Sequence, residues 1–193
     1  SDAASMIRPA NLRGLSADST LITTNGKRRH HASVIAFQGG GVNDGSQGAD
    51  ISVIPAIALK RVEVLRDGAS AQYGSDAIAG VINFVLDDIS EGGSLSYKMG
   101  EYTEGDGATT TIAGKYGLPL GQDGFVTTSF QIRQADDTSR SLQRPDAAAL
   151  IAAGNTAVAN PAQVWGAPKI DDDVTFFMNA GVTNSDGSES YMF

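Results

Sequence analysis

Residues 61–86 read RVEVLRDGASAQYGSDAIAGVINFVL and combine two apolar runs with a glycine-rich elbow in a short length of chain. In residues 61–66, Arg61, Glu63 and Leu65 alternate with Val62, Val64 and Arg66, which predicts a strand with one mainly apolar side. An Asp-Gly pair breaks this run, and residues 69–79 follow as a short helix of small side chains that is interrupted by Gly74 and ended by Gly80. Residues 81–86 form a second apolar strand. The stretch therefore predicts a strand, an elbow, a short helix and a strand within one compact mixed sheet.

The chain before this stretch predicts short elements separated by flexible segments. Leu21–Thr24 is followed by Asn25-Gly26, a pair that favours positive φ at both central positions of a tight turn. Residues 37–50 have the glycine and polar composition of a loop. Pro55 can begin a short helix that runs to Leu59.

The pattern of hydrophobic residues changes after residue 91, where apolar and polar side chains alternate over long predicted strands. These predicted strands lie near residues 95–99, 110–116, 126–133, 174–183 and 189–193. Short turns at residues 117–124 and 184–188 join some of them, whereas residues 135–173 form a long excursion. This excursion holds one predicted helix, 146–153, with Gly154 as its stop. Short turns on one side and a long loop on the other are typical of an outer-membrane barrel.

The composition excludes some classes of protein but does not identify the function. The 193 residues carry 14 basic and 22 acidic side chains, a formal net charge of −8, which argues against a general nucleic-acid binder. No cysteine is present, so a disulfide framework and a thiolate metal site are excluded. No apolar run approaches the roughly 18 residues of a spanning helix, but strands of a barrel give a weaker signal. By pattern alone, the alternating strands fit a membrane barrel or a soluble antiparallel sandwich.

Residues 61–86 resemble the end of the plug domain of TonB-dependent outer-membrane receptors, through RVEVLR, GASAQYGS and AIAGVIN. Upstream, residues 11–30 resemble the plug hairpin of the same family, with NLRGL and NGKRR, and GADISVIPAIALKRVEVL joins the two pieces in the family's order. Residues 92–140 and 165–193 resemble the first barrel strands of these receptors.

The resemblance implies an α+β plug domain at 1–90 followed by antiparallel transmembrane β-barrel strands at 91–193, an incomplete barrel. It implies a part of a bacterial outer-membrane receptor that imports a scarce nutrient, most readily a ferric siderophore, with the plug gating the barrel. Cobalamin, sugars and other metal chelates are alternative cargoes. The implied partners are outer-membrane lipids and the TonB energy-coupling protein, which would act through a segment that is not visible here. The rival class is a soluble β-rich binding or adhesion domain.

The resemblance also implies two sets of functional residues. Arg61, Glu63 and Arg66 are the candidates for ion pairs between the plug and the wall of the barrel; ordinary solvation of a strand edge is the alternative. Phe37, Gln38 and Asn43 lie in the predicted apical loop and are the candidates for ligand contact; a plain solvated loop is the alternative.

Other motifs favour no enzyme, cofactor or metal site. The glycine run at 39–41 lacks the Gly-Lys-Ser/Thr continuation of a phosphate loop. His30-His31 point to opposite faces if they lie on a strand, and Asp171–Asp173 lacks the glycine-spaced pattern of a calcium loop. With two adjacent histidines and no cysteine, no nucleophilic triad can be assembled. Aromatic side chains suited to interfacial girdles of a barrel are Tyr97, Tyr102, Tyr116 and Trp165, the last in the predicted long loop; packing in the core of a sandwich is the alternative.

Overall fold

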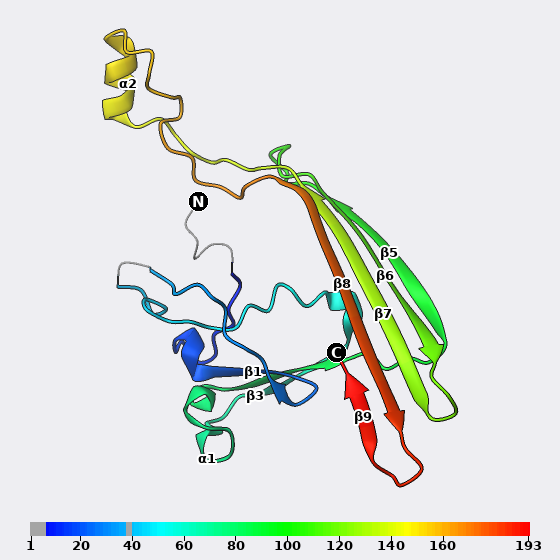
Figure 1. The fold of residues 1–193 in the computed structure, drawn as a ribbon. Coiled ribbons are helices and arrows are strands. Elements are labelled where there is room, and N and C mark those ends of the chain that lie inside the picture. The colour runs from blue at the N-terminus through cyan, green and yellow to red at the C-terminus, as the bar shows by residue number, and fades with distance from the viewer. Residues whose placement is uncertain (1–6, 38–39) are drawn as a thin grey trace. The chain divides into compact units, whose positions relative to one another are not determined.

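The computed structural model describes residues 7–37 and 40–193, which contain a four-stranded and a five-stranded sheet (Figure 1). By internal contacts the chain divides into two compact units. The first comprises Ser1–Leu95, Ala113–Gln131 and Thr175–Phe193, and the second comprises Ser96–Ile112 and Ile132–Val174. The first unit therefore contains the whole four-stranded sheet together with parts of the longer strands. In the described residues, no helix combines the length and apolarity needed to cross a membrane.

The four-stranded sheet has the order β2-β1-β4-β3. Its strands are β1 (Thr20–Thr24), β2 (Lys27–Arg28), β3 (Leu59–Leu65) and β4 (Gly80–Leu86). β4 pairs in parallel with β1 and antiparallel with β3, so the sheet is mixed as the sequence predicts. Short 3₁₀ turns, η2 (Ala17–Ser19) and η3 (Ala56–Ala58), lead into β1 and β3. The helix predicted at 55–59 is this single 3₁₀ turn, with Pro55 as its extended N-cap residue.

The β1–β2 hairpin turns at Asn25-Gly26, where φ is 48° and 75°. Positive φ at both positions is what a two-residue hairpin turn requires, so the prediction from the Asn-Gly pair is confirmed. The turn is also fixed to β4: Leu86 donates its N–H to Asn25 Oδ1 at 2.9 Å, and Gly26 donates to Asn83 Oδ1 at 2.9 Å.

The elbow between β3 and β4 consists of α1 (Ser70–Tyr73) and η4 (Ser75–Ala77), which are separated at Gly74 with φ of 94°. Its small side chains allow a close approach to the sheet, since buried Ala69 and Ala77 pack with Leu21 and Val81. The other face of the sheet is covered by a second cluster, formed by Ile22, Ala49, Ile54 and Phe84. The two central strands are therefore covered on both faces, with alternate residues of β1 and β4 entering different cores, whereas β2 and β3 are largely exposed.

The five-stranded sheet has the sequential order β5-β6-β7-β8-β9. Its strands are β5 (Gly92–Gly100), β6 (Thr109–Pro119), β7 (Gly124–Ala135), β8 (Ile170–Thr183) and β9 (Glu189–Met192). Short turns join β6 to β7 and β8 to β9, whereas β7 and β8 are joined by a long loop that contains α2 (Pro145–Ala152). The predicted layout of strands and turns is confirmed, with Gly154 after α2 at a φ of 90°.

Two boundaries of these strands differ from the sequence prediction. β8 begins at Ile170, so Asp171–Asp173 lie within the strand instead of at the end of a loop. β6 continues to Pro119, which shortens the predicted turn at 117–124. In both places the strand extends past its regular alternation, because pairing with the neighbouring strand outweighs the local composition.

Alternate residues of the long strands form two chemically different faces. The side that we call the apolar face carries exposed large side chains, namely Leu95, Tyr97, Met99, Ile112, Tyr116, Leu118, Phe130, Ile132, Val174 and Phe176. A Cβ atom built on Gly114 would lie 2.6 Å from the Phe130 ring and 3.4 Å from Leu95, so β5, β6 and β7 point these side chains to one side. The opposite phase, the polar face, includes Lys115, Thr127 and Asn179.

Gly80 is the glycine on which the small sheet depends most. Its φ is 142°, and a Cβ atom added there would lie 2.2 Å from the carbonyl oxygen of Leu65. We expect Gly80→Ala to lower the free energy of unfolding by at least about 2 kcal/mol, because backbone strain and a backbone clash act together. Urea unfolding in detergent measures this effect. Gly68→Ala is the control, since its Cβ would meet only an ordinary contact at 3.5 Å; equal effects of the two substitutions would contradict the prediction.

Candidate functional site

The three residues that directly follow β4, Asp87, Asp88 and Ile89, connect the small sheet with the long strands; we call residues 87–89 the strap. The Asp87 carboxylate forms an ion pair with Lys115 Nζ of β6, and its backbone N–H donates to Ala58 at 2.8 Å. Asp88 pairs with Lys60 of β3 at 2.7 Å. The strap therefore touches the end of the small sheet on one side and β6 on the other.

The backbone of the strap is held by two further strands. Asn179 of β8 donates its Nδ2–H to the carbonyl oxygen of Asp87 at 3.0 Å. The Thr127 hydroxyl of β7 donates to the carbonyl oxygen of Ile89 at 2.8 Å. Asp87, Thr127 and Asn179 are 7%, 2% and 5% exposed, so these polar groups are satisfied inside the first unit. The strand residues that contact the strap, Lys115, Thr127 and Asn179, all belong to the polar face.

A second contact joins the β1–β2 hairpin to β9. Lys27 Nζ lies 5.5 Å from the centre of the Tyr191 ring, within the range of a cation–π interaction. Lys27 and Tyr191 are both exposed, unlike the groups around the strap. In the part of the chain that the structure describes, the small sheet is thus joined to the long strands by the buried hydrogen bonds of the strap and by the exposed Tyr191 ring.

The predicted wall-contact residues lie on β3 and just after it. Arg61 Nε donates to Glu63 Oε1 at 2.7 Å, and Asn83 Nδ2 donates to Glu63 Oε2 at 2.9 Å. The Asn83 hydrogen bond, followed by that of Arg61, lowers the pKa of the Glu63 carboxyl group. Arg66 is exposed beyond the end of β3. These contacts hold the sheet together, and a role for the three residues against a barrel wall stays a prediction.

The strap contacts escape sequence reasoning because they join residues far apart in the chain. Lys115, Thr127 and Asn179 lie 28, 38 and 92 positions from their partners. One signal exists: an acidic pair directly follows an apolar strand, and the polar phase of the next strands offers a lysine.

Two of the three predicted ligand residues, Phe37 and Asn43, lie in the described part of the chain. Phe37 is 79% exposed. Asn43 instead anchors the loop, because its Oδ1 accepts hydrogen bonds from Asn11 Nδ2 at 2.7 Å and from the Ala17 N–H at 3.0 Å. Gln38 lies outside the described residues. Below the tip, Ala36 donates to Ser46 at 2.9 Å and Gly45 donates to Ala36 at 2.8 Å, so the loop is closed at its base. Ligand contact by these residues stays a prediction.

The second unit holds a charged cluster next to the β5–β6 loop. Arg140 forms ion pairs with Asp106 and, at 3.3 Å, with Glu104, and it lies over the Tyr102 ring at 5.8 Å. The hydrogen bond from Arg140 lowers the pKa of the Asp106 carboxyl group. This cluster ties the long β7–β8 loop to the shorter β5–β6 loop.

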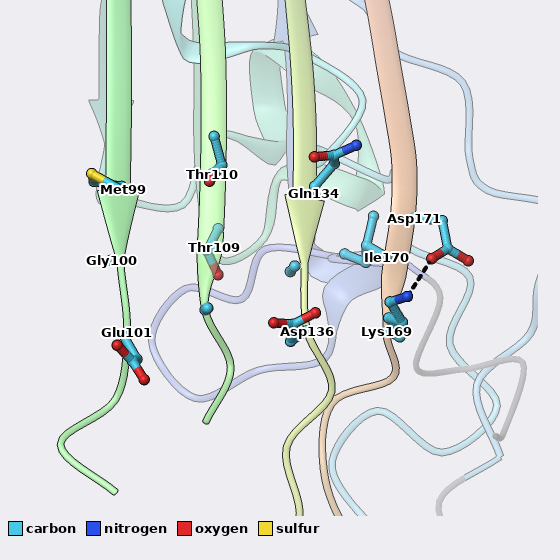
Figure 2. A pocket seen from close by; sticks show the side chains of 12 residues that line it. Met99, Gly100, Glu101, Thr109, Thr110, Gln134, Asp136, Lys169, Ile170 and Asp171 are labelled. Carbon is cyan, nitrogen blue, oxygen red and sulfur yellow. Dashed lines mark ion pairs between the residues drawn. The ribbon is translucent and has the colours of Figure 1, made fainter. Parts of the chain in front are cut away.

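A cavity of about 500 Å³ lies in the second unit, where the strands meet these loops (Figure 2). Its charged lining residues are Glu101, Asp136, Lys169 and Asp171. Lys169 pairs with Asp171 at 2.8 Å; this hydrogen bond raises the pKa of Lys169, and Asp136 adds to the effect. Within residues 7–37 and 40–193, no three His, Cys, Asp or Glu side chains are grouped closely enough to hold a metal ion.

Comparison with known proteins identifies the first part of the chain. Residues 3–81 match the family described as the TonB-dependent receptor plug domain. Two solved structures of the ferric enterobactin receptor PfeA share the fold, one of them a point mutant from Pseudomonas aeruginosa. Their sequence identities are 20% and 22%, the TM-scores are 0.58 and 0.59, and the alignments cover 86% and 88% of this chain. The chain spans 23% of the length of each receptor.

The fold is therefore that of a plug domain followed by antiparallel strands, which here form an open sheet. The chain carries a TonB-dependent receptor plug domain at residues 3–81, and the predicted resemblance is confirmed. The matched family is one of receptors and not of enzymes.

The pKa of Asp106 offers a test of the loop cluster. The native carboxyl group titrates below its usual range, so the stabilisation by Arg140 is present above the ordinary carboxyl pKa and is lost as the pH falls through the lowered pKa. We expect Arg140→Gln to raise the pKa of Asp106, as measured by carboxyl-carbon NMR titration.

Arg144→Gln is the matched control for this titration. Arg144 pairs with Asp146 in the same loop and lowers the pKa of that carboxyl group through a hydrogen bond. The control should move the titration of Asp146 and leave that of Asp106 in place. An unchanged Asp106 pKa in Arg140→Gln would show that the ion pair does not form.

Proposed function

We propose that this chain forms the plug and the first wall strands of a TonB-dependent receptor in the bacterial outer membrane, which imports a scarce nutrient. The boundary of the plug falls near residue 90, directly after the strap. The observation that carries the proposal is the side of the long strands on which the strap lies. It lies on the polar face, through Lys115, Thr127 and Asn179.

This choice of face favours a barrel over a soluble sandwich. In a water-soluble sandwich, the apolar faces of the sheets pack together and the polar faces meet solvent. Here the polar face receives the strap, and the apolar face leaves Leu95 75% and Met99 73% exposed. Lipid is the solvent that suits such a face, and tyrosines such as Tyr97 and Tyr116 suit the membrane–water interface.

A plug with these contacts can both fill a wide barrel and be rearranged. Barrels of about 22 strands need a plugged lumen. Hydrogen bonds and ion pairs at a polar wall can be exchanged for hydrogen bonds to water, which apolar packing cannot offer. The outer membrane has no ATP, so the work would come from the TonB energy-coupling protein, acting on a segment beyond the described strands.

A ferric siderophore is the cargo that we propose. The exposed Phe37, on a loop closed at its base and anchored by Asn43, supplies an apolar contact at the ligand side of the plug. Similar folds in receptors named for ferric enterobactin support this cargo class. Cobalamin, sugars and other metal chelates are the competing cargoes.

Uptake by cells that lack the complete gene tests the proposal. Deletion should abolish energised uptake of at least one radiolabelled ferric chelate and slow growth under iron limitation, and a plasmid copy of the gene should restore both. Growth on limiting carbon sources, with iron in excess, is the control. Normal uptake of every ferric chelate together with slow growth on a sugar would contradict the siderophore and leave the importer.

A further inference from the structure

Gly117 provides the place where the strap lies against β6. A Cβ atom added to Gly117 would lie 2.3 Å from the carbonyl oxygen of Ile89 and 2.7 Å from its carbonyl carbon. These are backbone atoms, which cannot turn aside as a flexible side chain could. The strap therefore lies directly on the backbone of β6, and only glycine permits this approach.

The contacts on either side of Gly117 fix the strap in two directions. Lys115, two residues earlier on the same face of β6, pairs with Asp87. Thr127 of β7 holds the carbonyl oxygen of Ile89, and Asn179 of β8 holds that of Asp87. Since Asp87, Thr127 and Asn179 are buried, moving the strap would leave several polar atoms without partners at once.

The hairpin contact is of a different kind. Lys27 meets Tyr191 through an exposed cation–π contact, in which water can replace the ring without leaving a buried group unpaired. The two attachments of the small sheet to the long strands are therefore unequal, with the stronger one at the carboxyl end of the plug.

We propose that Gly117, Lys115, Thr127 and Asn179 are positioning residues that keep the carboxyl end of the plug on the wall throughout transport, so that opening begins at the hairpin end. This inference rests on the proposed function as a plugged importer. Gly117 is, in this proposal, the point at which the backbone of the strap contacts β6. Displacing the strap from Gly117 should leave the barrel open without any energy input.

The test uses the full-length receptor in outer membranes. Gly117→Ala should raise entry of a bulky hydrophilic antibiotic at least about tenfold, and this leak should persist in cells without TonB. Gly100→Ala is the matched control, because Gly100 lies in β5 with open space around its Cβ position and no positive φ. Heat-modifiable migration in gels verifies that each barrel has folded.

Lys115 provides a second pair of variants in case Gly117→Ala does not assemble. Lys115→Met should leak and Lys115→Arg, which keeps the charge, should remain closed. Closed barrels in both Gly117→Ala and Lys115→Met would overturn the inference. If the unaltered receptor took up no ferric chelate while Gly117→Ala still caused the leak, the proposed cargo would be contradicted and the proposed role of Gly117 would be supported.

The order of opening has its own readout. Ala58 bonds to the strap through its carbonyl oxygen, whereas Ala49 packs with Ile22 of the hairpin strand, and both alanines are buried. During energised transport, a cysteine at 49 should react faster with an impermeant maleimide than it does at rest, while a cysteine at 58 should not. Faster labelling at 58 than at 49, or no change at either position, would overturn the proposal.

Discussion

The chain leaves the small sheet after β4, and the carbonyl oxygens of Asp87 and Ile89 then need hydrogen-bond donors from outside that sheet. Asn179 and Thr127, on two strands that are distant in sequence, supply these donors, and Lys115 forms an ion pair with the Asp87 carboxylate. An unpaired buried carbonyl group would cost about 1–3 kcal/mol, so the polar phase of the long strands is constrained at these positions. The apolar phase must then point the other way.

This constraint links the two parts of the chain. Because side chains alternate along a strand, a polar face that receives the strap leaves the apolar face without a protein partner in the described part of the chain. A slip of one residue in the register of β6 would replace Lys115 by Tyr116 and break the match with Asp87. Gly114 and Gly117 show the same division: the Phe130 ring covers the first on the apolar face, and the strap covers the second on the polar face.

Local chemistry made much of the fold predictable. The Asn25-Gly26 turn, the break at Gly74 and the alternation after residue 91 each depend on neighbours in sequence, and the structure agrees with them. The strap was not predictable, since its partners come from three later strands. Arg61 and Glu63 have the charges expected of a wall contact, and the hydrogen bond from Arg61 to Glu63 needed the fold to be seen; their contact with a wall stays a prediction. Phe37 could be placed on a loop by composition, while the anchoring role of Asn43 needed the fold.

The orientation of β6 tests the account most directly. Nitroxide labels placed singly at 112, 113, 116 and 118 of the full-length receptor in bilayers would report access to oxygen, which concentrates in lipid, and to a water-soluble nickel complex. The account predicts oxygen maxima at 112, 116 and 118, and low access to both reagents at 113, which is buried on the polar face. Maxima for the nickel complex at 112, 116 and 118 would contradict it, because those positions would then face water.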